Sequence, residues 1–318
     1  MTLRLTRTTI SIALVAAAVG AGAWLAVGDA GPRGTSTAAP ASDPVRHAPL
    51  MATGPHAAGL TVQARGPGGA ELFSDGSMLL PLDSYDGYGT DVNESLIYRA
   101  VTKVEQRCMQ AEGLTLPQGW GGNYLPTVLP PLVYFGVATV DDAKTYGYRL
   151  PQPVPASAPP SAVPEAVTTA FYGKPGGDGG CLQQAVATLD IDKAVDAYGE
   201  VQTLRMKALD DTHQDPLVKA ANAAWSACMK TAGYSYPDPL TASNDKALLG
   251  SGSPSSAEKQ TAAADATCKQ HTGYEQTFMS ADATHQLGRM ASEGSRLDQV
   301  LKEWRDVLDK ATAVTVAT

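Results

Sequence analysis

The sequence predicts an all-α fold, an antiparallel helical domain of two cysteine-stapled half-units with a Pro/Gly/aromatic insert. Three observations lead to this prediction. An eleven-residue phrase occurs twice, as RCMQAEGLTLP from Arg107 to Pro117 and as ACMKTAGYSYP from Ala227 to Pro237. One further cysteine follows each copy, Cys181 after the first and Cys268 after the second. Around all four cysteines, apolar residues recur at the three- and four-residue steps of an amphipathic helix.

The first 28 residues carry an export signal. Two arginines precede an uncharged run from Ile10 to Val27, and these 18 residues would rise about 27 Å as a helix, nearly the thickness of the bilayer core. We therefore expect residues 1–28 to be a membrane anchor. The basic residues before the run should stay cytoplasmic, which places the rest of the chain outside. Signal cleavage, giving a secreted protein, stays open because Ala21–Ala23 and Gly28–Ala30 offer small residues at suitable spacing.

Residues 29–70 are rich in Ala, Gly, Pro, Ser and Thr and contain no Trp, Phe or Tyr. Such a composition buries too little apolar surface to fold, so we expect a disordered tether. Residues 71–318 should form the extracytoplasmic helical domain. This domain holds 19 basic and 30 acidic residues. The acidic balance disfavours nucleic acid and anionic lipid as partners, so we expect the membrane to be contacted by the N-terminal helix alone.

In each half, local signals mark a helix that carries one copy of the repeated phrase. The first helix should run about five turns and end at Gly113; its apolar face consists of Leu96, Ile97, Val101, Val104, Cys108 and Ala111. In the second half, Asp215 is a good N-cap, Pro216 suits the first turn, and Gly233 marks the end. Each cysteine lies five residues before the glycine. We expect each of these two cysteines to face another secondary-structure element and not solvent.

Further helices are predicted around and after the second cysteine of each half. A capping box at Ser255–Glu258 begins the helix that contains Cys268. The segment Asp190–Asp211 predicts a long helix in between. After Gly273, apolar residues at helical spacing predict one or two closing helices; they are Tyr274, Phe278, Leu297, Leu301, Trp304 and Leu308.

Four cysteines outside the cytoplasm, with no Cys-x-x-Cys pair, indicate two structural disulfides. Of the three possible connectivities, one gives both half-units the same internal bridge. We therefore expect Cys108 to pair with Cys181 and Cys228 to pair with Cys268.

The first half carries an extra segment, Gln118–Pro151, in which glycine, proline and aromatic residues replace helical periodicity, followed by a polyproline-like stretch to Pro164. We expect this segment to form a semi-rigid flap that lies against the helical bundle and borders the largest groove. Its aromatic side chains are candidate ligand-binding residues because rigid, amphipathic rings bind sugars and peptides; they are Trp120, Tyr124, Tyr134, Phe135, Tyr146 and Tyr148. Packing onto the domain's own core is the alternative.

The sequence contains no recognisable catalytic or metal-binding motif. The chain has no Gly-x-Ser-x-Gly and no His-Glu-x-x-His motif. The group Cys268-Lys-Gln-His271 resembles half a zinc site but has no second pair, and Asp83–Asp91 does not match an EF-hand loop. We expect no metal, no cofactor and no catalytic residue. The alternative, a carboxylate-dependent enzyme acting on cell-wall material, would need two carboxylates in one pocket and a raised pKa on one of them.

The paired Cys-Met-x-x-x-Gly phrases and three other stretches resemble uncharacterised exported, membrane-anchored proteins of Streptomyces-type actinobacteria. These stretches are PLDSY from Pro81, AWSACMKTAGYSYPDP from Ala224 and TAAADATCKQHTGY from Thr261. The resemblance implies an envelope location and a helical, cysteine-stapled domain, sometimes working beside export transporters, and supplies no functional residues. We therefore expect a non-enzymatic cell-envelope protein that binds a peptide, a wall fragment or a transport-complex partner.

Overall fold

The computed structural model describes residues 60–85, 91–118, 120, 132–149, 163–174, 177, 179–250 and 252–317, without the side chains of 91–95 and 132–133. The expected anchor at residues 1–28, most of the expected tether and Tyr124 lie outside this part of the chain. Among the described residues, no helix combines the length and the apolar character that a membrane crossing requires.

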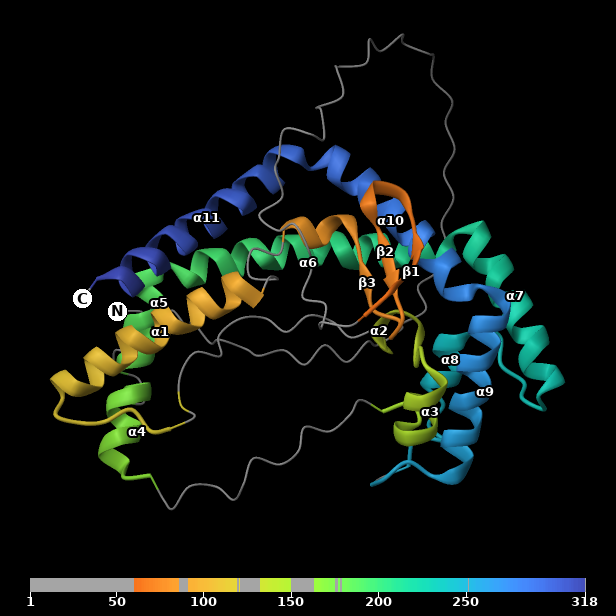
Figure 1. Cartoon of the computed structure of the whole chain (residues 1–318), viewed down its shortest axis with the longest axis horizontal. Coiled ribbons are helices and arrows are strands. Elements are labelled where there is room, and N and C mark those ends of the chain that lie inside the picture. Colours follow the sequence, from red (N-terminus) through yellow and green to blue (C-terminus); the bar gives the residue numbers. More distant parts are fainter. Residues whose placement is uncertain are drawn as a thin grey trace, which may run out of the picture. The chain divides into compact units, whose positions relative to one another are not determined.

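The protein is mostly helical (Figure 1). It contains two disulfides. Short 3-10 turns, η2 and η3, cover Pro67–Gly69 and Pro81–Tyr85. The α-helices are α1 Asp91–Ala111, α2 Leu132–Phe135, α3 Val140–Tyr146, α4 Glu165–Tyr172, α5 Cys181–Leu189, α6 Ile191–Gln214, α7 Pro216–Thr231, α8 Pro239–Ser243, α9 Ser256–Thr272, α10 Tyr274–Ser292 and α11 Gly294–Val316.

A small antiparallel sheet corrects the expectation of a purely helical fold. Its strands β1 (Val62–Arg65), β2 (Glu71–Phe73) and β3 (Met78–Leu79) lie in that order. Strand β1 falls within the range expected to be a tether. The strands fold because their apolar side chains have a partner surface on α10, where Leu72 packs in one cluster with Met279. Burial against a helix supplies the stability that so short a sheet lacks by itself.

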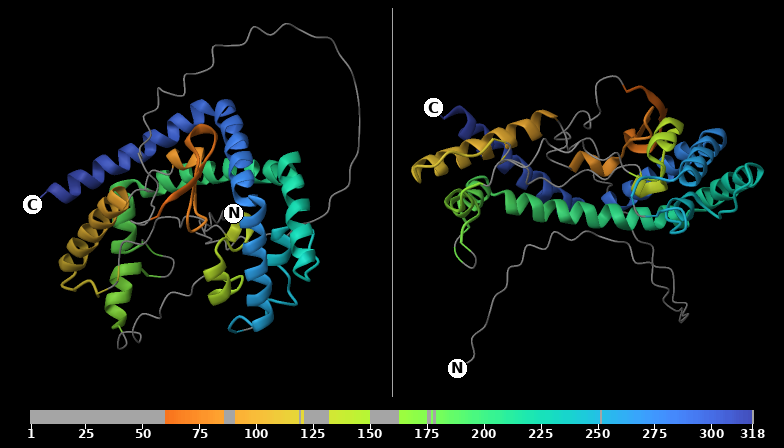
Figure 2. Two further views of the ribbon diagram at one scale, coloured as in Figure 1. Left: turned by 45° about the vertical axis from the view of Figure 1, so that its right-hand side comes forward. Right: turned by 90° about the horizontal axis from the view of Figure 1, so that it is seen from below.

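Most of the core lies in two apolar clusters. One is built from α1, α5, α6 and α11 and contains the fully buried Trp304. The other is built largely from α2, α3, α7, α9 and α10 and contains the fully buried Trp225. Helix α6 contributes Val201 to the first cluster and Leu209 to the second, and Figure 2 shows it as one continuous helix. Each large apolar side chain stabilises the fold by about 1.5–3 kcal/mol when buried.

The two copies of the repeated phrase end their helices in the same way. The glycine of each copy adopts a positive φ, 71° in the first and 92° in the second. The next residue then donates its backbone N–H to the methionine carbonyl, Leu114 to Met109 at 2.8 Å and Tyr234 to Met229 at 2.9 Å. This hydrogen bond is the signature of the Schellman motif, in which glycine avoids the strain of a left-handed residue. Both predicted helix ends are confirmed.

Both predicted disulfides are confirmed. Cys108 bonds to Cys181 and joins α1 to the start of α5, and Cys228 bonds to Cys268 and joins α7 to α9. The predicted N-caps also form. Asp215 accepts from Leu217 N–H at 2.8 Å, and Ser255 accepts from Glu258 N–H at 3.1 Å.

Candidate functional site

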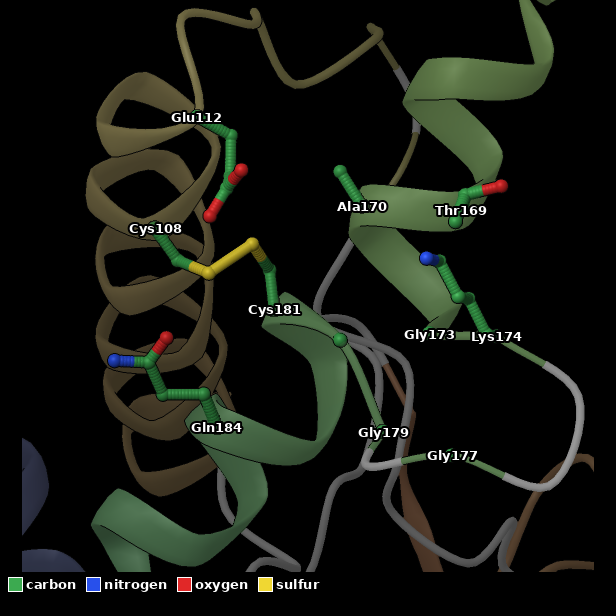
Figure 3. A pocket seen from close by; sticks show the side chains of 11 residues that line it. Cys108, Glu112, Thr169, Ala170, Gly173, Lys174, Gly177, Gly179, Cys181 and Gln184 are labelled. Carbon is green, nitrogen blue, oxygen red and sulfur yellow. A yellow bond between two sulfur atoms is a disulfide. The ribbon is translucent and has the colours of Figure 1, made fainter.

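A groove of about 410 Å³ lies between the last turn of α1 and the end of α4 (Figure 3). The Cys108–Cys181 disulfide lines it. Four glycines and five other residues complete the lining: Gly173, Gly177, Gly179, Gly180, Glu112, Thr169, Ala170, Lys174 and Gln184. We call this space the first groove.

The glycine-rich stretch after α4 gives the first groove its shape. Helix α4 ends where Gly173, at φ 82°, donates its N–H to Thr169 O at 2.8 Å. The chain then returns so close to α4 that a Cβ on Gly180 would lie 2.2 Å from Ala170 O. Only glycine permits this approach, since real Cβ atoms do not come so near a backbone oxygen. The return places Cys181 at the start of α5 and within bonding reach of Cys108.

Opposite charges stand on the two walls of the first groove. Glu112, just beyond the end of α1, and Lys174, just beyond the end of α4, are both exposed. Figure 3 shows Glu112 beside the disulfide and Lys174 on the far side of the groove. A ligand that carries both an amine and a carboxylate would find a complementary charge on each wall.

Three aromatic rings gather around the end of α4. Trp120 lies with its ring centroid 5.1 Å from that of Phe171 and 5.4 Å from that of Tyr172. Phe171 is buried, Trp120 is half-buried, and Tyr172 is 56% exposed. Trp120, Phe171 and the disulfide cysteines belong to one apolar cluster. The trio, named here the α4 aromatic patch, is next in sequence or in packing to the first groove but is not part of its described lining.

The structure brings three of the six predicted aromatic residues of the insert together, in the core and not on a ligand-binding surface. Tyr134, Phe135 and Tyr148 are buried in the second large cluster, where Phe135 packs edge-on against Phe278 with centroids 5.6 Å apart. Tyr146 is half-buried on α3. Trp120 instead joins the cluster beside the first disulfide. The alternative of core packing thus holds for three of the six residues.

Sequence reasoning missed two members of the α4 aromatic patch, Phe171 and Tyr172. The available signal was the word AFYG, which places two aromatics on the last turn of a short helix next to a glycine stop.

A second groove, of about 460 Å³, lies at the other disulfide. Besides Cys228 and Cys268, it is lined by small and polar residues of α7 and α9, namely Thr231, Ala232, Ala263, Ala264 and Thr267. Val140 and Lys144 of α3 form the remaining lining. The predicted insert therefore contributes to this groove through α3. Lys144 is the one charged side chain in the lining.

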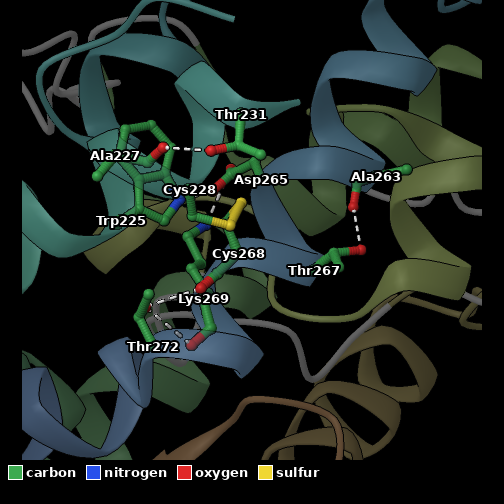
Figure 4. The surroundings of a disulfide bond; sticks show 10 residues. All are labelled: Trp225, Ala227, Cys228, Thr231, Ala263, Asp265, Thr267, Cys268, Lys269 and Thr272. Carbon is green, nitrogen blue, oxygen red and sulfur yellow. Dashed lines mark hydrogen bonds and ion pairs between the residues drawn. A yellow bond between two sulfur atoms is a disulfide. The ribbon is translucent and has the colours of Figure 1, made fainter. Parts of the chain in front are cut away.

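A buried polar network surrounds the second disulfide (Figure 4). Lys269 Nζ lies 3.0 Å from Asp265 Oδ2 and donates to Val137 O at 2.8 Å, and both charged side chains are fully buried. Trp225 Nε1 donates to Asp265 Oδ1 at 2.9 Å. Burial raises the pKa of Asp265 to about 6 despite the lysine beside it. Removal of the Asp265 carboxylate from water raises its pKa by more than the neighbouring Lys269 lowers it.

Two other interior carboxyls have raised pKa values for the same reason. Burial raises the pKa of Glu275 to about 7, and burial raises the pKa of Asp282 to about 6. Neither side chain lines the two grooves, and neither does Asp265. Glu112 is the one carboxylate in the described linings. Neither groove therefore presents the pair of carboxylates that glycoside hydrolysis uses.

Within the described residues, no group of three or more His, Cys, Asp or Glu side chains is placed to hold a metal ion. His271 is exposed in the last turn of α9, and its neighbour Cys268 is in a disulfide.

Comparison with known proteins adds no further constraint: no family model, no curated protein and no solved structure matches this chain.

Proposed function

We propose that the chain is a non-enzymatic binding domain of the cell envelope that captures an extended peptide in the first groove. In this proposal the run Ile10–Val27 anchors the chain and the helical domain lies outside the membrane. One observation carries the proposal. The exposed Tyr172 stands in the α4 aromatic patch beside an open groove whose walls carry Glu112 and Lys174.

The chemistry of this surface suits a peptide. Tyrosine and tryptophan give large contact areas at a low cost in side-chain entropy, and they dominate binding at peptide and protein interfaces. Opposite charges on facing walls fix the direction of a chain that carries both signs. The excess of acidic over basic residues in the domain repels polyanions, which would otherwise compete with a peptide for aromatic and basic side chains.

The repeat supports a duplicated architecture. We infer that the domain consists of two antiparallel half-units, in each of which a helix ending in the Cys-Met phrase is bridged to a second helix. The disulfide of each half lines a groove. At the equivalent position of the phrase, Glu112 lines the first groove and Ala232 lines the second. The described lining of the first groove therefore carries both charge signs, whereas that of the second carries only Lys144, and this favours the first groove for a peptide with both charges.

The test is selection of peptides from a displayed random library on the immobilised domain, followed by affinity measurement with two variants. Tyr172→Ala removes the exposed ring of the α4 aromatic patch, and Tyr98→Ala is the matched control because Tyr98, on α1, is 45% exposed. We expect Tyr172→Ala to weaken binding about thirtyfold, the effect of a typical hot-spot residue, and Tyr98→Ala to leave it unchanged. Equal affinities for the two variants would contradict the proposed site.

A further inference from the structure

The two disulfides differ in the chemistry of their surroundings. Each lines a groove, and in each the cysteine of the repeated phrase is half-buried while its partner is almost fully buried. Cys181 is the first residue of α5, whereas Cys268 lies near the C-terminal end of α9. The comparison within one molecule makes the second disulfide a control for the first.

We propose that the Cys108–Cys181 disulfide is a thiol–disulfide exchange site, which accepts a small thiol through the first groove, and that Cys228–Cys268 is purely structural. This inference goes beyond the proposed function, since it requires no peptide. Access to the sulfur atoms, stabilisation of the leaving thiolate and the charge next to each sulfur decide how readily a disulfide exchanges.

Access to the sulfur atoms is similar at the two disulfides and differs within each of them. In each groove the cysteine of the repeated phrase, Cys108 or Cys228, is half-buried and its partner is almost fully buried. A thiol that enters the first groove therefore reaches Cys108 more readily than Cys181. The difference between the two disulfides comes from the leaving thiolate and from the charges beside the sulfur atoms.

The position of Cys181 stabilises the thiolate that must leave. The first helical hydrogen bond of α5 runs from Gln184 N–H to Gly180 O, and the N-cap Gly180 has no side chain that could accept from the N–H groups of the first turn. A sulfur at such a helix start carries negative charge readily. The N–H groups around Cys268 are engaged within α9, so a thiolate there gains no such support.

The charges in the groove set which sulfur is attacked. Glu112 stands beside Cys108, so a thiolate on Cys108 is disfavoured (Figure 3). Lys174 on the other wall attracts an anionic thiol. The better leaving group is thus Cys181, and Cys108 is the more exposed of the two sulfurs. The incoming thiolate therefore attacks Cys108 Sγ, the Sγ–Sγ bond breaks, and its electron pair leaves on Cys181. The product is a mixed disulfide on Cys108 and a thiolate on Cys181. A second thiolate can release Cys108 and form the disulfide of the small thiol.

The test uses glutathione as the probe on the unmodified full chain. Timed samples are quenched in acid, alkylated and mapped by mass spectrometry without further reduction. We expect the Cys108–Cys181 bridge to open about tenfold faster than the Cys228–Cys268 bridge, because a thiolate that is stabilised at a helix start leaves faster. Trapped glutathione should be found on Cys108. Equal opening rates, faster opening of Cys228–Cys268, or glutathione on Cys181 would each overturn the proposal.

Discussion

The buried carboxyl of Glu275 gives the sharpest test of the energetics of this fold. Glu275 lies at the start of α10 and is 8% exposed, and its Oε1 is buried without a hydrogen-bond partner among the described residues. Burial raises its pKa from 4.5 to about 7, Lys269 lowers it, and Asp265 raises it further. Replacement by Gln keeps the shape and removes the charge.

The sign of the effect follows from the raised pKa. Below pH 4.5 the Glu275 carboxyl is protonated in both the folded and the unfolded state, and it costs no stability. Between pH 4.5 and about 7 the unfolded state ionises while the folded state stays protonated, so the free energy of unfolding falls as the pH rises. Above about pH 7 the cost is constant. A pKa difference of about 2.5 corresponds to about 3 kcal/mol.

Urea unfolding with intact disulfides measures this difference. We expect Glu275→Gln to be more stable than the parent chain by up to about 3 kcal/mol at pH 8 and equal to it at pH 4. Glu112→Gln, at an exposed position, should change stability by less than about 0.5 kcal/mol at both values. A Glu275→Gln chain that is no more stable at pH 8, or is equally stabilised at pH 4, would refute the reasoning.

Four further substitutions test other parts of the structure by the same urea assay. Lys269→Met should cost about 3–5 kcal/mol at pH 8, because it leaves Asp265 buried without its cation; a cost below about 1 kcal/mol would show that water reaches the pair. Phe135→Ala should cost about 3–5 kcal/mol, and a near-neutral result would place this ring outside the core. Gly180→Ala should destabilise by about 1–3 kcal/mol through overpacking, whereas Gly199→Ala, in open space on α6, should stabilise by about 0.5–1 kcal/mol; the reverse order would contradict the close approach at α4.

Features governed by local interactions could be predicted from the sequence. The helix ends at Gly113 and Gly233 depend on a few consecutive residues, and the N-cap at Asp215 depends on one side chain and the next turn. The disulfide pairing followed from the repeat, because equivalent positions in two copies of one phrase were expected to have equivalent partners.

Features governed by distant partners could not be predicted. The strands are two to four residues long, too short for an alternating pattern, and they fold against α10 more than 200 residues later in the chain. Ser255–Glu258 reads as a capping box, yet the Glu258 carboxylate pairs with Arg149 at 3.1 Å instead of the backbone of Ser255. Composition showed that the insert is aromatic, but only the tertiary packing decides that Phe135 is core.

The candidate site was predictable in part. The paired cysteines predict that the end of α1 lies near the start of α5, and the structure places them there. The second wall of the first groove comes from α4, whose position depends on the close return of the chain at Gly180. Such backbone contacts leave no periodic signal in a sequence. Phe171 and Tyr172 were therefore missed, although Trp120 was named.

Hydrogen exchange, measured with and without a library-selected peptide, tests the central claim most directly. The account predicts slower exchange in α4 and in the last turn of α1, residues 165–174 and 108–114, because the peptide would cover the first groove and the α4 aromatic patch. Exchange in α3 and around Cys268, which line the second groove, should stay unchanged. Protection confined to the second groove, or no protection in α4, would contradict the account.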